Sequence, residues 1–162
     1  TVNGLIQGCL PIMSYNYGAK NADRVKKTFR LLLASCLIYS FVIWGAIMLF
    51  PKVFAGIFTP DAEMIAFTAK ALRVYCGVMC IFGIQIACQM TFVSIGNAPC
   101  SIIVAIVRKF VLLLPLIYIM PQLIADKTMG VYAAEPVADV IAVTFTAILF
   151  TVQFKKALSF KK

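Results

Sequence analysis

Long apolar runs constrain this sequence more than any other feature. Residues 31–50 form a stretch of twenty positions without a charged side chain, and residues 74–95 form one of twenty-two. A helix rises about 1.5 Å per residue, so each run can span the roughly 30 Å hydrocarbon core of a bilayer. Several such runs within 162 residues predict an all-α membrane protein whose main surroundings are the lipid bilayer.

Composition and charge exclude two other classes. Hydrophobic residues make up 62% of the chain and charged residues 13%, so the apolar surface is too large to hide from water in a soluble domain. The net charge of +9 raises the question of nucleic acid. The Lys and Arg residues stand at the ends of apolar runs, however, which favours a role in membrane topology and no nucleic-acid partner.

Turn and helix-end signals divide the chain into about five membrane spans, which we expect at residues 1–17, 31–50, 74–95, 110–125 and 130–154. The first span begins at Thr1 without a preceding charged region, so we expect a piece of a longer chain and no signal peptide. One side receives segment 18–30, the turn at Gly96 with Arg108 and Lys109, and the tail. These hold eleven basic residues against four opposite, which predicts a multi-pass cell-membrane protein with a cytoplasmic C-terminus.

Catalysis and metal binding have little support in the residue types. The chain contains no His, which removes His-based triads, His metal sites and His acid–base chemistry. Its six Cys residues form no CxxC pair and are interpreted as buried apolar thiols. We therefore expect no enzyme, no metal site and no cofactor.

Two carboxylates at membrane depth are the strongest functional candidates. Glu135 and Asp139 are four residues apart and share one face of the last helix. A carboxylate in hydrocarbon costs roughly 2.5–3.5 kcal/mol, so such groups face a cavity, pair with a cation or stay protonated. The functional interpretation is a proton or sodium site. The alternative is that Glu135, near the membrane interface, caps a helix or pairs there.

Four amides are candidates for a substrate path: Gln85, Gln89, Gln7 and Asn16. Amides in membranes also serve as hydrogen-bonding contacts between helices, and both interpretations stay open. Asn16 has a further interpretation as an interface or turn residue. Arg108 and Lys109 are interpreted as anchors whose long side chains reach the interface.

Three segments together resemble one known family. They read PIMSYNYGAKNADRVKKTFR, QMTFVSIGNAPCSIIVAIVRKFVLLLPLIYIMP and GVYAAEPVADVIAV, and they follow one another along the chain. This pattern resembles the second lobe of the multidrug and toxic-compound extrusion (MATE) family. The residues that carry the family pattern are Pro11, Tyr15, Asn16, Tyr17, Gly18, Gly96, Arg108 and Pro136.

The resemblance implies a twelve-helix antiporter of two six-helix lobes, of which residues 1–162 would be a partial C-terminal lobe. Such a protein exports cationic, drug-like amphipathic compounds in exchange for sodium or protons, and the missing N-terminal lobe is an implied partner. The resemblance also supports Gln85 and Gln89 facing the cavity between the lobes. Two alternatives remain: a flippase for lipid-linked oligosaccharides in the same superfamily, and a membrane fragment without activity. The mid-membrane groups, taken as acidic or neutral, favour cation export over a flippase.

Overall fold

The structure is a computed structural model that describes residues 2–124 and 126–159, with the side chains of residues 2, 3 and 5 left aside. Helices account for every regular element in those ranges. They are α1 (Val2–Gly18), α2 (Ala22–Leu49), α3 (Pro51–Gly56), α4 (Ala62–Tyr75), a 3₁₀ turn η1 (Met79–Ile81), α5 (Phe82–Ser94), α6 (Ala98–Ile106), a π-helix η2 (Val107–Leu113), α7 (Leu114–Leu123) and α8 (Lys127–Leu158).

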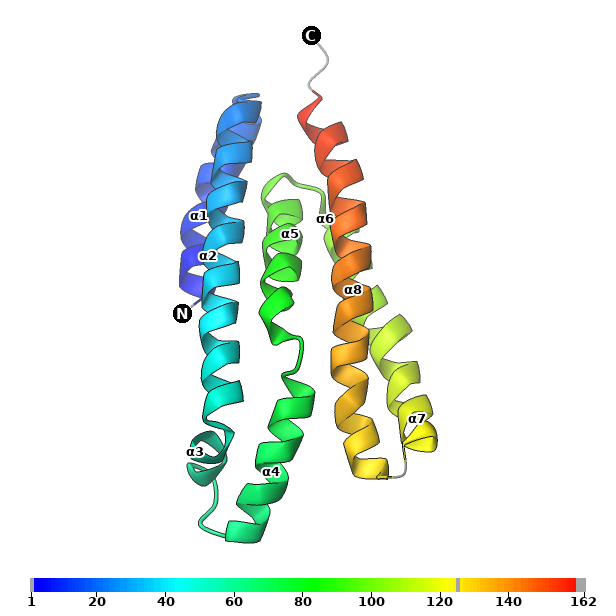
Figure 1. Ribbon diagram of the computed structural model, residues 1–162. Coiled ribbons are helices and arrows are strands. Elements are labelled where there is room, and N and C mark those ends of the chain that lie inside the picture. The colour runs from blue at the N-terminus through cyan, green and yellow to red at the C-terminus, as the bar shows by residue number, and fades with distance from the viewer. Residues whose placement is uncertain (1, 125, 160–162) are drawn as a thin grey trace.

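The long helices run side by side, with α5 in the middle of the bundle (Figure 1). It contacts α1 and α2 on one side and α6 and α8 on the other. The α6–η2–α7 stretch lies along α8.

Three helical stretches among the described residues are long and apolar enough to cross a membrane, namely α2, the continuous α6–α7 stretch and α8. A fourth crossing results if α4 and α5 count as one bent span, while α1 has 17 residues, at the short end of the spanning range. Helix α2 begins inside the basic segment 18–30, because the Asn21 side chain accepts from the Arg24 N–H and caps it. Residue 1, at the start of the expected span 1–17, and residue 125, at the end of the expected span 110–125, lie outside the described residues.

The expected span at residues 74–95 is interrupted near its start. Helices α4 and α5 meet at an angle of 46° across a short break that contains Gly77. The indole Nε1 of Trp44 in α2 donates a hydrogen bond of 3.0 Å to the Gly77 carbonyl. Because a free carbonyl is costly in a membrane, this bond supplies a partner that the interrupted helix cannot.

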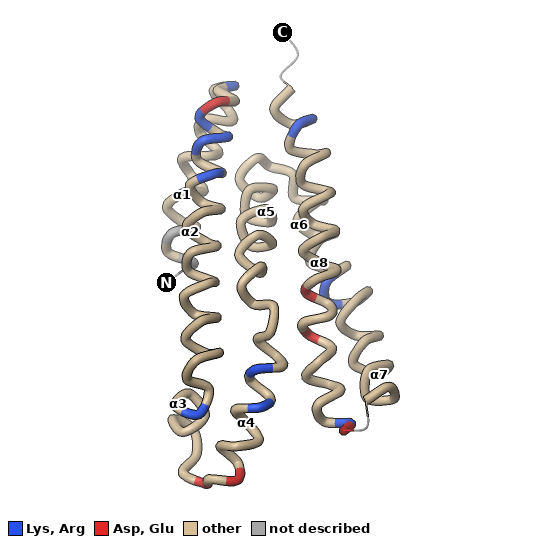
Figure 2. Tube along the Cα trace, in the orientation of Figure 1, with Lys and Arg blue, Asp and Glu red and all other residues tan. Residues whose placement is uncertain are grey.

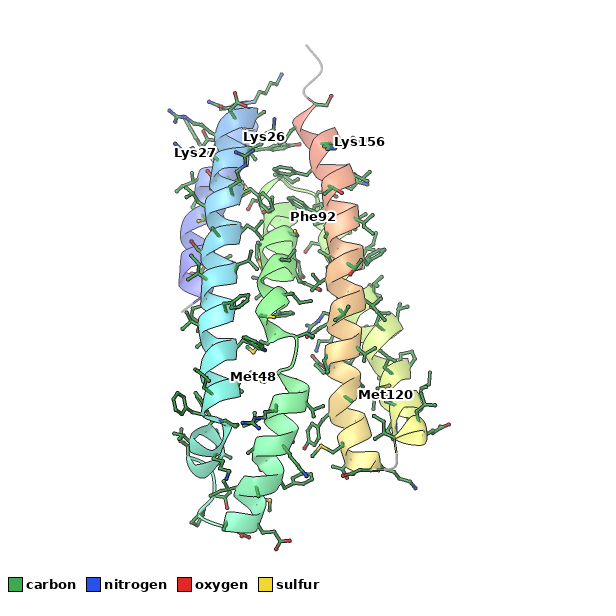
Figure 3. The ribbon with its side chains drawn as sticks, viewed as in Figure 1. Lys26, Lys27, Met48, Phe92, Met120 and Lys156 are labelled. Atoms are coloured by element: carbon green, nitrogen blue, oxygen red, sulfur yellow. The ribbon has the colours of Figure 1, made fainter. Side chains whose placement is uncertain are left out.

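Two apolar core clusters adjoin α5, one shared with α1 and α2 and the other with α6 and α8. Phe92 of α5 is fully buried and contacts Phe150 of α8 with the rings edge to face, their centroids 5.3 Å apart (Figure 3). On the opposite side of α5, Gly83 approaches the backbone of α2 so closely that a Cβ there would lie 2.7 Å from the Cys36 carbonyl oxygen. A small residue is therefore required where these two helices cross.

Charged residues gather toward the two ends of the bundle, and a further group lies between them on α8 and the stretch beside it (Figure 2). One end carries the start of α2 and the end of α8, with Lys20, Arg24, Lys26, Lys27, Arg30, Lys155 and Lys156 against Asp23 alone. The other end carries Lys52, Lys70, Arg73 and Lys127 together with Asp61, Glu63 and Asp126. This group contains Arg108, which contacts Glu135 and Asp139 of α8.

Candidate functional site

Arg108 lies near the middle of the 26-residue stretch Ala98–Leu123. It belongs to the π-helix η2, where the Leu114 N–H bonds to the Lys109 carbonyl five residues earlier. Pro115 directly follows and has no N–H to donate, so the backbone before it needs a different hydrogen-bond pattern. Such π turns inside α-helices occur frequently at functional sites.

The guanidinium of Arg108 joins both candidate carboxylates. Its Nε donates a hydrogen bond of 2.8 Å to Asp139 Oδ1, and its Nη2 lies 2.8 Å from the same oxygen. Nη2 also donates to Glu135 Oε1 at 3.0 Å. The three side chains are 10–15% exposed, so the contacts form with little water around them. Charge-assisted bonds of this length are the stronger class of protein hydrogen bonds.

The geometry follows from the local sequence of α8. Glu135 and Asp139 stand one helical turn apart and present their side chains on the same face toward η2. Pro136 lies between them and donates no backbone hydrogen bond, so the α-helical partner four residues earlier, the carbonyl of Tyr132, loses that contact. On the other side, the ring of Phe82 at the start of α5 lies 4.5 Å from the guanidinium carbon of Arg108, a cation–π contact.

A small cavity of about 150 Å³ opens beside the three charged groups. Its walls come from the end of α4, the break before α5, η2 and α8: Tyr75, Cys76, Met79, Phe82, Arg108, Glu135 and Asp139. Three backbone irregularities thus meet at one level, namely the break at Gly77, the π-helix and Pro136. With one guanidinium and two carboxylates in their charged forms, the cavity carries a formal charge of −1.

The structure corrects the expected role of Arg108 and shows where Glu135 and Asp139 lie. Arg108 is not an anchor that reaches the membrane interface, since its guanidinium binds both carboxylates inside the bundle. Its neighbour Lys109 is exposed. The mid-membrane groups are therefore not all acidic or neutral. Arg108 and Lys109 also no longer count among the basic residues assigned to the membrane surface at the Gly96 turn. Glu135 and Asp139 both line the cavity and pair with a cation.

The four candidate amides are scattered. Gln85 is buried at 2% exposure, and its Oε1 has no hydrogen-bond partner among the described residues, whereas Gln89 is half-buried and Gln7 is exposed. Asn16 lies in the last turn of α1: its Nδ2 donates to the Ile12 carbonyl at 2.7 Å, and its own carbonyl accepts from the Asn21 N–H. None of the four lines the cavity beside Arg108.

The remaining family-pattern residues lie in α1 and just after α5. Pro11 is within α1, Gly18 ends it, and Tyr15 is 76% exposed while Tyr17 packs against the core. Gly96 follows α5 with a φ of +74°, a conformation that favours glycine. The sequence-based interpretation did not assign Tyr75 and Cys76 to the site, or Trp44 to the break. Gly77, a weak helix former, was the available signal for that break.

Comparisons with known proteins bear on most of this fold. The family model MatE matches residues 2–119. The chain is 31% identical to a chain from a structure of the MATE multidrug transporter DinF-BH in complex with a ligand, with a TM-score of 0.87 over 99% of this chain and 35% of that one. A second solved chain, named protein A, is 32% identical, with a TM-score of 0.84 over 97% of this chain and 34% of that one.

A third solved structure shows the fold alone. It is the inward-facing conformation of a multidrug resistance MATE family transporter of the MOP superfamily, 16% identical, with a TM-score of 0.90 over 99% of this chain and 37% of that one. No curated protein matches the sequence. The chain spans about a third of the length of the solved chains that it matches. Its match to the family model over most of its length shows that the chain belongs to the MatE family of membrane transporters.

Proposed function

We propose that this chain is part of the C-terminal lobe of a secondary active transporter that exports cationic amphipathic compounds in exchange for sodium or protons. Glu135 and Asp139 take the coupling cation. The observation that supports this most is the cavity lined by Arg108 and the two carboxylates, within helices long and apolar enough to cross a membrane. Ionisable groups at this depth are costly, and they usually mark ion or proton pathways.

The size of the cavity argues for a small ion at this position. Pockets for drug-sized ligands measure roughly 300–1,000 Å³. The cavity beside Arg108 holds about 150 Å³, which suits an ion with a few waters but not an amphipathic drug. We therefore place the drug elsewhere, between this lobe and the N-terminal lobe, with Gln85 and Gln89 as candidates along its path.

Alternating access needs parts of the lobe that can deform. Transporters of this kind rock two halves around a site near the membrane midplane, often with discontinuous helices at the site. Here the 46° break, the π-helix and Pro136 surround the same cavity. A change of occupant in the cavity can thereby change the angle between α4 and α5.

The orientation follows from the charged ends of the bundle. The end with the start of α2 and the end of α8 carries seven described basic residues and one acid, against four basic residues and three acids at the other end. Lys26, Lys27 and Lys156 lie together at the richer end (Figure 3). By the positive-inside bias, this difference supports a cytoplasmic location for that end and for the C-terminus.

The test is ethidium efflux from cells that express the full-length parent gene, driven by an imposed sodium or proton gradient. Efflux that follows one gradient supports the proposal and identifies the ion. Asp139→Asn should weaken the dependence on the gradient, whereas Asp23→Asn, at an exposed position at the start of α2, should leave it unchanged. Unchanged coupling in Asp139→Asn at normal expression would refute the assignment of Asp139. Absence of efflux for every cationic dye would favour the flippase alternative.

A further inference from the structure

Two adjacent basic residues of η2 have opposite surroundings. Arg108 is held between Glu135 and Asp139, while Lys109 is exposed and has no ion pair among the described residues. A positive charge that is needed only to orient the helices in the membrane could stand at position 108 or at position 109. Burying a guanidinium costs several kcal/mol, which a stabilising role alone repays poorly, since apolar replacements of buried ion pairs are often no less stable. The position of Arg108 therefore calls for a function of its own.

We propose that Arg108 is a built-in competitor of the coupling cation, so that a sodium-sized monovalent cation binds Glu135 and Asp139 only when the guanidinium leaves them. This inference rests on the proposed function and specifies how the same site is regulated. The oxygens that a hard cation would use, Asp139 Oδ1 and Glu135 Oε1, are the ones that now accept from Arg108. Occupation by one cation excludes the other.

The displaced guanidinium has a place to remain. Phe82 lies 4.5 Å from the guanidinium carbon, and its ring face attracts the cation without using the carboxylates. Arg108 also belongs to the π-helix. In a π-helix each N–H bonds to the carbonyl five residues earlier, whereas in an α-helix it bonds to the carbonyl four residues earlier. A small change of this backbone is enough to move the side chain relative to α8. The exchange thus needs no large rearrangement of the lobe.

Competition of this kind sets the apparent affinity for the ion. If the carboxylates are free of Arg108 for only a small fraction of the time, the apparent dissociation constant rises by the inverse of that fraction. An opposite charge within about 4–6 Å typically changes the affinity of a carboxylate for a proton by roughly 10- to 1,000-fold. We expect an effect of about tenfold or more on the affinity for a monovalent cation.

The experiment measures equilibrium binding of ²²Na⁺ to the purified full-length parent and to a charge series. Arg108→Gln removes the competitor and leaves a formal charge of −2, so binding should tighten about tenfold or more. Glu135→Gln keeps the competitor and should weaken binding. Arg108→Gln combined with Glu135→Gln restores −1 without a competitor, and it should still bind more tightly than the parent.

Two further variants protect the test. Arg108→Lys keeps the charge but lacks the planar fork that reaches both carboxylates, so it should compete less and bind sodium more tightly than the parent. This variant and the double variant carry the test if Arg108→Gln alone fails to fold. Lys109→Gln removes the same charge one residue away on the exposed side and should change binding less than twofold.

The outcomes separate the inference from the proposed function. A purely structural Arg108 predicts that Arg108→Lys and the double variant bind sodium as weakly as the parent or more weakly, and that result would overturn the inference. So would a lack of sodium binding in all variants, even if proton-driven efflux persists. Conversely, the expected order of affinities in a parent that exports no cationic dye supports the competitor and refutes drug export.

Discussion

The two sides of α5 are built differently from similar sequence. Toward α2, the neighbouring helix runs unbroken for 28 residues without a proline, and Gly83 lies directly against its backbone. Toward η2 and α8 the helices carry a π turn and a proline, and an Arg with two carboxylates lies between them. The difference teaches that charge and backbone irregularity occur together here. Irregular helices leave room for a polar cavity, whereas regular helices pack without one.

The strongest test of this difference removes the charge at the centre of the irregular side. Arg108→Ala leaves Glu135 and Asp139 without their cation in a largely buried position and should lower the free energy of unfolding by about 3–5 kcal/mol. Lys109→Ala should change it by about 0.5 kcal/mol or less. Denaturant unfolding of the purified full-length parent in detergent compares the two. Equal effects of both substitutions would mean that Arg108 is not engaged as the structure describes.

The regular side should respond to volume instead of charge. Gly83→Ala places a Cβ 2.7 Å from the Cys36 carbonyl oxygen, so α2 and α5 must separate, at a cost of about 1–3 kcal/mol. Gly45→Ala is the matched control in α2, because no atom lies within 4 Å of its Cβ. It should be neutral or stabilise by up to about 1 kcal/mol through helix propensity. Thermal unfolding of the two variants measures both effects. A stabilising effect of Gly83→Ala would rule out the close crossing of α2 and α5.

The break before α5 connects the two sides and depends on Trp44. Trp44→Phe keeps an aromatic ring but removes the Nε1 donor, so the Gly77 carbonyl loses its 3.0 Å hydrogen bond. We expect a loss of about 1 kcal/mol, together with faster amide hydrogen exchange in residues 76–81. Phe41→Leu, which alters only a ring packed edge-on against Trp44, should leave that exchange unchanged. Unaltered exchange in Trp44→Phe would show that the bond does not hold the break.

The smallest expected effect concerns two threonines that are both fully buried. Thr91 Oγ1 donates to the Ala87 carbonyl at 2.7 Å, whereas Thr146 Oγ1 has no hydrogen-bond partner in the described part of the chain. Thr91→Val should therefore cost about 0.5–1.5 kcal/mol, while Thr146→Val should be neutral or slightly stabilising. A marked loss in Thr146→Val would indicate that its hydroxyl binds a group from the remainder of the transporter.

Much of the fold was predictable, because lipid demands a simple pattern. Apolar runs of about twenty residues predict helices wherever they occur, and the helical class is confirmed. The cavity was predictable only in part. The spacing of Glu135 and Asp139 placed them on one face. Pro115 indicated an irregular helix near Arg108, but it did not show that the irregularity is a π turn that contains Arg108. Runs of similar hydropathy do not show where a helix breaks, so the interruption at Gly77 was missed as well.

The sequence by itself determined a helical membrane chain, its basic ends and its family, since hydrophobicity and short motifs are properties of neighbouring residues. Only the tertiary structure decided which charges meet. Arg108 and Asp139 are separated by thirty-one positions, and their 2.8 Å contact exists because α8 packs along the α6–η2–α7 stretch. A charge at membrane depth must find a partner, but its sequence position does not say which helix supplies one. That choice is made by packing.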